Sequence, residues 1–309
     1  MAKATRAAFG ETLIKLVEEG MDVMAVDADL AGSTTTAKFG AAYPDRLVDV
    51  GIAEQNMIGV ASGLSLTGRT VFTGSFAVFG AGRCYEQIRN TVCDSELNVK
   101  VCPTHSGITV GPDGATHEML EDIALMRTLP PMRVMVPADY ASACAALKLA
   151  AKTPGPFYVR LGRATLPELY DEGVEYDDVR IANVLREGAD VSIMACGVEV
   201  AQALSAAEKL AEEGISAEVI DIVSVKPLDE ETILASAAKT GAVVTVEEHS
   251  VYGGMGSAVA ELLAEKRPCR VSRMGMTTFG TSGDPNALLA HFGLDDAAIV
   301  ARVHEVLGR

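Results

Sequence analysis

Three things are scarce in this sequence of 309 residues: paired cysteines, long apolar runs and positive charge. The six cysteines form no CxxC pair, which is typical of reduced core thiols in a cytoplasmic protein. No uncharged apolar run approaches the roughly 18 residues of a transmembrane helix, and residues 1–6 lack the apolar core of a signal peptide. The net charge of −16 argues against nucleic acids and anionic membranes as partners. A site for an anionic ligand must therefore be built from locally placed cations.

The first half of the sequence alternates apolar strands with helices. Apolar and β-branched runs predict six strands, at residues 23–30, 47–50, 70–73, 99–104, 132–136 and 157–161. Apolar residues at helical spacing and small-residue segments predict helices between them, at residues 3–20, 58–64, 76–89, 118–129 and 140–152. This alternation is typical of a doubly wound, mostly parallel sheet.

A second α/β unit follows an acidic segment. Residues 166–178 make a poor core, so we expect a linker at 166–188 between domains at 1–165 and 189–309. The second domain is predicted to contain strands at 191–195, 217–222, 242–246 and 269–274, with helices near 198–213, 229–239, 255–266 and 297–307. The predicted fold class is thus α/β, with two doubly wound sheets. A glycine loop at residues 253–256 could hold an anion, but tight strand–helix packing explains it better because the dinucleotide fingerprint is incomplete.

Glu54 stands where a predicted strand gives way to a helix. The apolar run 47–50 ends at Gly51 and the helical segment 58–64 follows, which places Glu54 at the carboxyl edge of the sheet. Ligands of open α/β sheets bind at that edge. A carboxylate in such an apolar setting needs a partner, because burying it alone is costly. The alternative, that Glu54 is an ordinary acidic residue meeting a helix macrodipole, stays open at this point.

The sequence Gly-Ile-Ala-Glu-Gln-Asn-Met around Glu54 resembles the signature of the pyrimidine-binding domain of thiamine diphosphate enzymes. The resemblance implies that Glu54 hydrogen-bonds N1′ of the aminopyrimidine and so has a catalytic role as well as a cofactor-binding one. It further implies that Phe76 and Phe79 stack on the pyrimidine ring, although ordinary core is the alternative, and that Asp29 contacts the cofactor. Transketolases usually carry a third aromatic residue one turn further on, where this sequence has Gly82.

Two histidines and a carboxylate, His105, Asp113 and His117, surround a glycine-rich loop in the pattern His-x7-Asp-x3-His. They could bind a metal, but no cysteine and no HExxH motif accompanies them. The segment instead resembles the transketolase pattern Thr-His-…-Gly-x-Asp-Gly-x-Thr-His. That resemblance implies that Asp113 orients the sugar C2 hydroxyl and that His117, as a catalytic residue, bonds to the two-carbon unit being transferred. It also implies that His105 binds the substrate phosphate.

Arg6, Ser33 and Arg163 lie far apart in the sequence, and each alone would be interpreted as a surface residue. All three fall where transketolases place ligands of the sugar phosphate, so the resemblance implies a single phosphate-binding set. Guanidinium groups match phosphate oxygens and stay charged at any relevant pH. Such a set would supply the local cations that the acidic composition requires.

The sequence has no Gly-Asp-Gly segment, with which thiamine diphosphate enzymes hold Mg²⁺ and the diphosphate. The resemblance therefore covers the C-terminal half of a transketolase and implies no metal ligand in this chain. It implies an N-terminal partner subunit that holds Mg²⁺ or Ca²⁺ with thiamine diphosphate, self-association within an α2β2 assembly, and phosphorylated sugars as substrates. The expected reaction transfers a two-carbon glycolaldehyde unit from a ketose phosphate to an aldose phosphate.

Three alternatives stay open at the level of sequence. The β-subunit of a 2-oxoacid dehydrogenase E1 shares the domain order, but it would not need cations such as Arg6 and Arg163. A relative of deoxyxylulose-phosphate synthase would share Ala-Glu-Gln and a run like residues 85–87. A noncatalytic binding or regulatory protein could keep the fold, but it would have no use for Glu54 together with the substrate-binding set.

Overall fold

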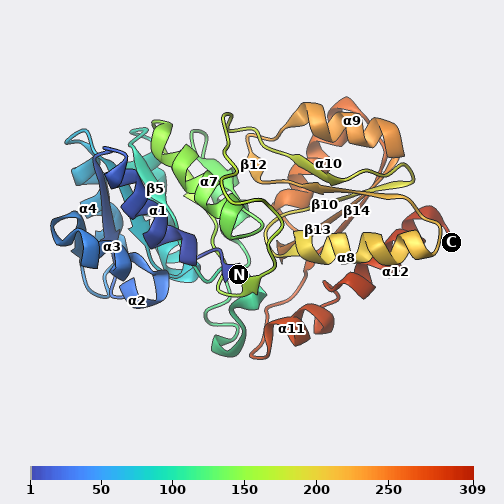
Figure 1. The fold of residues 1–309 in the computed structure, drawn as a ribbon, viewed down its shortest axis with the longest axis horizontal. Helices are drawn as coiled ribbons and strands as arrows, with labels where there is room; N and C mark the ends of the chain where they lie inside the picture. Colours follow the sequence, from blue (N-terminus) through green and yellow to red (C-terminus); the bar gives the residue numbers. More distant parts are fainter. Residues whose placement is uncertain (1) are drawn as a thin grey trace.

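The structure, a computed structural model, describes residues 2–309 and contains two α/β halves that lie side by side (Figure 1). Short apolar runs form the strands of the first half: β2 (Val23–Asp27), β3 (Leu47–Asp49), β4 (Thr70–Gly74), β5 (Val99–Val101), β6 (Arg133–Met135) and β7 (Phe157–Val159). Together with β12 (Ser224–Lys226), they form a sheet of seven strands in the order β12-β6-β7-β5-β4-β2-β3, parallel throughout except at β12. Two mostly parallel sheets in an α/β chain were predicted, and this fold class is confirmed.

The helices of the first half cover both faces of this sheet. They are α1 (Ala7–Glu18), α2 (Ala31–Thr34), α3 (Thr36–Ala42), α4 (Glu54–Ser65), α5 (Tyr85–Gln87), α6 (Asp122–Arg127) and α7 (Tyr140–Lys152). Two π-helical segments, η2 (Val78–Arg83) and η3 (Ile88–Cys93), flank α5, and 3-10 turns form η1 (Pro44–Arg46) and η4 (Ile108–Asp113). The predicted helix 118–129 is wrong at its start, because Met119 is extended in a β-bridge with Ser106 and the helix begins only at Asp122.

The second half repeats the strand–helix alternation. Its sheet has the order β14-β13-β10-β11-β9, and only β9 is antiparallel to its neighbour. The strands are β9 (Asn183–Arg186), β10 (Val191–Ala195), β11 (Ala217–Asp221), β13 (Ala242–Ser250) and β14 (Arg270–Met276). The helices are α8 (Glu199–Glu212), α9 (Glu230–Thr240), α10 (Met255–Lys266), α11 (Pro285–His291) and α12 (Asp296–Leu307). Helix α11 and strand β9, which lies inside the predicted linker, were not foreseen.

The chain crosses between the halves more than once. Strand β12 (Ser224–Lys226) belongs to the second half in sequence but pairs with β6 at the edge of the first sheet. Within the first half, β1 (Lys3–Ala4) pairs with β8 (Thr165–Leu166), which joins the two ends of that half. A single cluster of buried apolar side chains extends from Val134 in the first sheet through Val225 to Ile220 in the second. The predicted domain boundaries at 165 and 189 stay a prediction.

The glycine loop before α10 illustrates how tightly strand and helix pack. The carboxylate of Glu247 accepts hydrogen bonds from the backbone N–H groups of Met255 and Gly256, at 2.7 and 2.8 Å. A Cβ on Gly254 would lie 2.3 Å from the same carboxylate. The Glu247 carboxylate thus occupies the N-terminus of α10, where the helix dipole favours a negative charge. The packing interpretation of this loop is confirmed.

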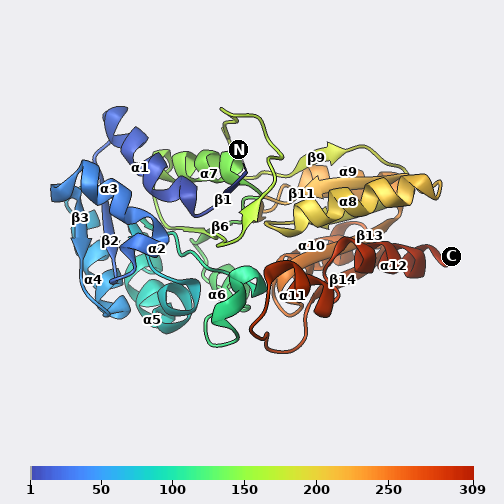
Figure 2. The same ribbon diagram turned by 60° about the horizontal axis from the view of Figure 1, so that its bottom comes forward.

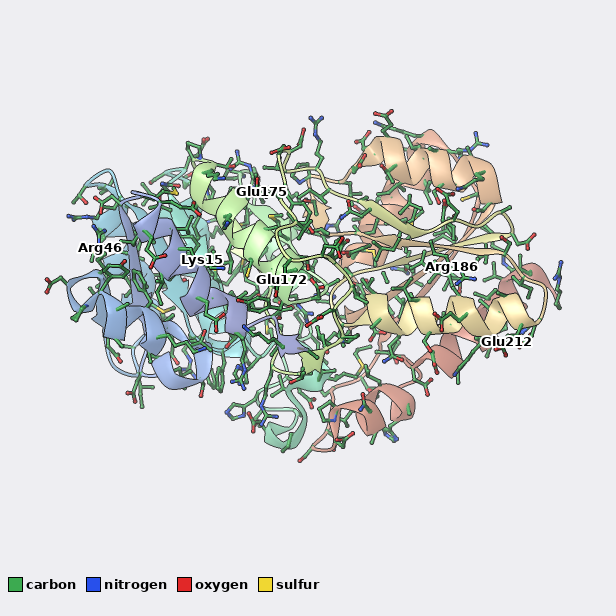
Figure 3. The ribbon with its side chains drawn as sticks, viewed as in Figure 1. Lys15, Arg46, Glu172, Glu175, Arg186 and Glu212 are labelled. Atoms are coloured by element: carbon green, nitrogen blue, oxygen red, sulfur yellow. The ribbon has the colours of Figure 1, made fainter. Side chains whose placement is uncertain are left out.

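Acidic side chains are exposed on both halves of the molecule. Figure 3 labels Glu172 and Glu175, whose exposed side chains lie on the segment that passes over helix α7. Glu212, at the end of α8, lies at the periphery of the second half in the same view. Within residues 2–309, no helix has both the length and the apolar character that a membrane crossing requires.

Candidate functional site

Glu54 opens helix α4, just beyond the carboxyl end of β3. The turn before it is held by Asp49, whose Oδ1 accepts the N–H groups of Gly51 at 2.9 Å and of Asp29 at 3.1 Å. The Glu54 side chain is only 4% exposed. Both of its oxygens accept from Nη1 of Arg83, each at 2.9 Å. The buried carboxylate therefore has the partner that its position demands, and this partner was not predicted from the sequence.

Four aromatic rings gather beside this ion pair. Phe76 forms a β-bridge with Thr104 just before the π-helical segment η2, which carries Phe79; the two ring centroids are 6.3 Å apart and the planes are nearly parallel at 16°. His105 stacks on Phe76 at 3.8 Å, and His117 meets Phe79 edge-on at 5.5 Å. Because Phe79 is half-buried, part of its ring stays accessible. The guanidinium of Arg83 lies over that ring, 4.6 Å from its centroid.

The predicted phosphate ligands lie together. Nη1 of Arg6 donates to the carbonyl of Ser33 at 2.9 Å and lies 3.5 Å from Nε2 of His105. Arg163 donates to the carbonyl of Val110 at 2.7 Å. Burial, and then the positive charge of Arg163, lower the pKa of Arg6, so the two guanidinium groups are close enough to repel each other. An anion between them would relieve that repulsion.

His105 is held as a neutral ring at the centre of both clusters. It is 2% exposed, and its Nδ1 lies 2.7 Å from the hydroxyl of Thr104. Burial, and then the charges of Arg6 and Arg163, lower the pKa of His105 to about 3. A neutral imidazole can donate one hydrogen bond to an anion without adding charge. The arginines therefore carry the positive charge of this cluster.

Backbone pairing brings these distant residues together. Thr5, which follows strand β1, accepts the N–H of Gly162 through its hydroxyl at 2.7 Å, and the N–H of Arg6 donates to the carbonyl of Gly162 at 3.3 Å. Arg6 therefore starts helix α1 next to Arg163. No short-range pattern in the sequence signals this contact, because its partners are separated by more than 150 residues.

Asp27 positions Ser33 and was not identified from the sequence. It is fully buried at the end of β2 and accepts from the hydroxyls of Thr34 and Thr36, at 2.8 and 2.7 Å. It also accepts the N–H of Leu30 at 2.8 Å. These bonds hold helix α2, which carries Ser33, and its junction with α3. The sequence did contain a signal for this role: an acidic residue ends an apolar strand, and threonines follow it a few positions later.

The second half of the chain supports the loop that carries Asp113 and His117. Glu248 accepts from the N–H and hydroxyl of Thr109, at 3.0 and 2.8 Å, and the hydroxyl of Ser282 donates to the carbonyl of Pro112 at 2.7 Å. Figure 2 shows α11 next to the adjoining green segment of the first half. Asp113 is exposed, and His117 is half-buried with its Nδ1 2.9 Å from the Thr116 hydroxyl. His117 thus borders the aromatic rings, whereas Asp113 is open to solvent.

One predicted residue stands apart from these contacts. Asp29 is exposed at the carboxyl end of β2, and its link to the site is through its backbone, which bonds to Asp49. No cluster of three or more His, Cys, Asp or Glu side chains suited to a metal ion occurs within the part of the chain that the structure describes. The chemical groups that the site presents to a ligand are a buried carboxylate, a partly open aromatic face and a pair of arginines.

Comparison with known proteins identifies relatives of both halves. A family model described as the transketolase pyrimidine-binding domain matches residues 1–168, and one described as the transketolase C-terminal domain matches residues 181–299. A "putative transketolase C-terminal section" of Methanocaldococcus jannaschii is 45% identical over 306 residues, covering 98% of this chain and 96% of that protein. A "6-deoxy-6-sulfo-D-fructose transketolase subunit" of a Clostridium species is 43% identical over 305 residues, covering 98% and 94%. A solved structure titled "split gene transketolase, inactive beta4 tetramer" is 47% identical with a TM-score of 0.91, covering 100% of this chain and 99% of that one.

Proposed function

The chain belongs to the transketolase family, and from that premise we propose that it is the C-terminal subunit of a two-component, thiamine-diphosphate-dependent transketolase. The proposed reaction moves a two-carbon glycolaldehyde unit from a ketose phosphate to an aldose phosphate. One observation carries the proposal: the buried carboxylate, the aromatic face and the paired arginines converge on one region. A noncatalytic relative would have no need of all three.

The described residues fit the pyrimidine end of thiamine diphosphate, on which the family depends. An aminopyrimidine is a planar ring with hydrogen-bond donors, and the planar guanidinium of Arg83 already contacts both the Glu54 carboxylate and the Phe79 face. Glu54 would hold the proton shared with N1′, while Phe76 and Phe79 would hold the ring plane. When bound, the cofactor supplies the nucleophilic carbon to which the two-carbon unit is joined.

The sugar would lie with its phosphate toward Arg6, Ser33, His105 and Arg163. Two guanidinium groups provide charge for a phosphate, and the neutral His105 provides a directional hydrogen bond. Asp113 and His117 would meet the other end of the sugar, where Asp113 would orient the C2 hydroxyl and His117 would bond to the transferred unit. Binding energy at the remote phosphate would then align the reacting carbons.

A second polypeptide would complete the site. We propose that an N-terminal subunit supplies the diphosphate- and metal-binding half, with Mg²⁺ or Ca²⁺, and that both chains assemble as α2β2. The relatives similar along nearly their whole length bear names such as "C-terminal section" and "subunit", which supports this division. The same names include a sulfonated sugar, so the anion at the far end of the substrate need not be a phosphate in every member.

Reconstitution tests this proposal directly. The purified chain should transfer no glycolaldehyde from xylulose 5-phosphate to ribose 5-phosphate, and activity should appear when the N-terminal subunit, Mg²⁺ and thiamine diphosphate are added. Full transketolase activity from this chain alone would contradict the two-component assignment. Turnover of pyruvate with a lipoyl acceptor, and none of ketose phosphates, would instead favour a 2-oxoacid dehydrogenase.

A further inference from the structure

Arg83 makes the contacts that the proposed function assigns to the cofactor ring. Its Nη1 donates to both oxygens of Glu54 at 2.9 Å, and its guanidinium lies 4.6 Å from the centroid of Phe79. A guanidinium is planar, carries several N–H donors and stacks on aromatic faces. One side chain of the protein thus meets the same carboxylate and the same ring face that an aminopyrimidine would use.

The two partners of this ion pair differ in how firmly they are held. Glu54 is 4% exposed at the first turn of α4, whereas the side chain of Arg83 is 48% exposed at the end of a π-helical segment. The Arg83 backbone is anchored, because its carbonyl accepts from the amide of Gln55 at 3.2 Å. The long side chain of an arginine can turn into solvent while its backbone stays in place. Only the arginine end of the pair can therefore leave.

We propose that Arg83 is an internal occupant of the pyrimidine pocket, which fills it in the cofactor-free chain and must swing outward before thiamine diphosphate binds. This inference rests on the proposed function of Glu54 and Phe79. The arginine stabilises the buried carboxylate of the unassembled subunit, which would otherwise be unpaired at a large cost. It also lowers the apparent affinity for the cofactor by the fraction of molecules whose pocket is filled.

Cofactor affinity of the assembled enzyme is the first test. Thiamine diphosphate is titrated calorimetrically, with Mg²⁺ present, into wild type, Arg83→Met and the control Arg89→Met, each assembled with the N-terminal subunit. Arg89 is also an exposed arginine, and it forms no ion pair among residues 2–309. Arg83→Met should bind about tenfold more tightly, as expected if roughly a tenth of wild-type molecules have an open pocket. Arg89→Met should match wild type. An unchanged or weakened affinity of Arg83→Met would overturn the inference, since a residue that helps to hold the cofactor would weaken binding when removed.

A double-mutant cycle provides a test that needs no catalysis. Unfolding of the chain is measured for wild type, Glu54→Gln, Arg83→Met and the double variant. Without cofactor, the cycle should give a coupling of about tenfold in the unfolding equilibrium constant, as for a charge-assisted hydrogen bond. In the assembled enzyme saturated with thiamine diphosphate, the coupling should vanish. If the coupling persists in the enzyme saturated with cofactor, or is absent from the free chain, the proposal that Arg83 fills the pocket is refuted.

The two proposals fail in different ways. If the assembled wild type binds no thiamine diphosphate, the proposed function is wrong, and this result is obtained before any variant is made. If wild type binds the cofactor and Arg83→Met binds it no more tightly, the proposed function stands and only the role of Arg83 is refuted.

Discussion

The neutral state of His105 leads to a quantitative prediction about stability. The ring is 2% exposed, stacks on Phe76 at 3.8 Å and lies near two arginines, and its pKa is lowered to about 3 from an ordinary value of 6.5. The perturbation is His105→Asn. Asparagine cannot titrate, and it tolerates the left-handed backbone that His105 adopts with φ of 61°.

The magnitude follows from proton linkage. Between pH 7 and pH 5 the unfolded chain takes up a proton at His105 and the folded chain does not, so the free energy of unfolding falls as pH falls. With the folded pKa near 3, the loss reaches about 2 kcal/mol at pH 5. Other groups titrate in the variant as they do in wild type, so they cancel when the two proteins are compared.

Urea unfolding at pH 7 and pH 5 measures the effect. Wild type should lose about 2 kcal/mol more of its unfolding free energy over this interval than His105→Asn does. If both proteins lose the same amount, His105 titrates normally in the folded state. The account of a neutral imidazole between two arginines would then be refuted.

Three further predictions concern the site and the core. Glu54→Ala should lower kcat of the reconstituted enzyme by roughly 10²–10⁴-fold at saturating cofactor, and near-normal turnover there would exclude its proposed role. Arg163→Ala should lower kcat/KM for xylulose 5-phosphate by about one to two decades but leave hydroxypyruvate nearly unaffected; equal losses with both donors would remove the phosphate assignment. Asp113→Ala, the matched comparison, should not single out the phosphorylated donor. Lys100 is fully buried, and burial lowers its pKa to about 7. Because the unfolded chain keeps that proton to higher pH, wild-type stability should rise between pH 7 and pH 10. Urea unfolding of Lys100→Met should lack this rise, and an equal rise in both proteins would contradict the buried, neutral lysine.

Local features of this molecule could be predicted and contacts between distant segments could not. The junction at Glu54 followed from an apolar strand, a glycine and a helix within a dozen residues, and the alternation of strands and helices followed from periodicity. The partner of Glu54 did not follow, because the π-helical turn that brings Arg83 back to the carboxylate has no recognised sequence pattern. The residue types of the anion cluster were recognised through a family resemblance. The pairing that joins Arg6 to Arg163, however, closes a loop of more than 150 residues and depends on the whole fold.

Strand β12 has a consequence for how this protein can be divided. A fragment that ends near residue 168 would keep the first sheet but lose β12, which leaves the edge of β6 uncovered. A bare strand edge is a template for intermolecular pairing. The same cut would separate Val225 and Ile220 from the buried cluster that they share with Val134. Truncated or fused versions of this chain should therefore keep both halves together, even though the sequence divides readily into two α/β units.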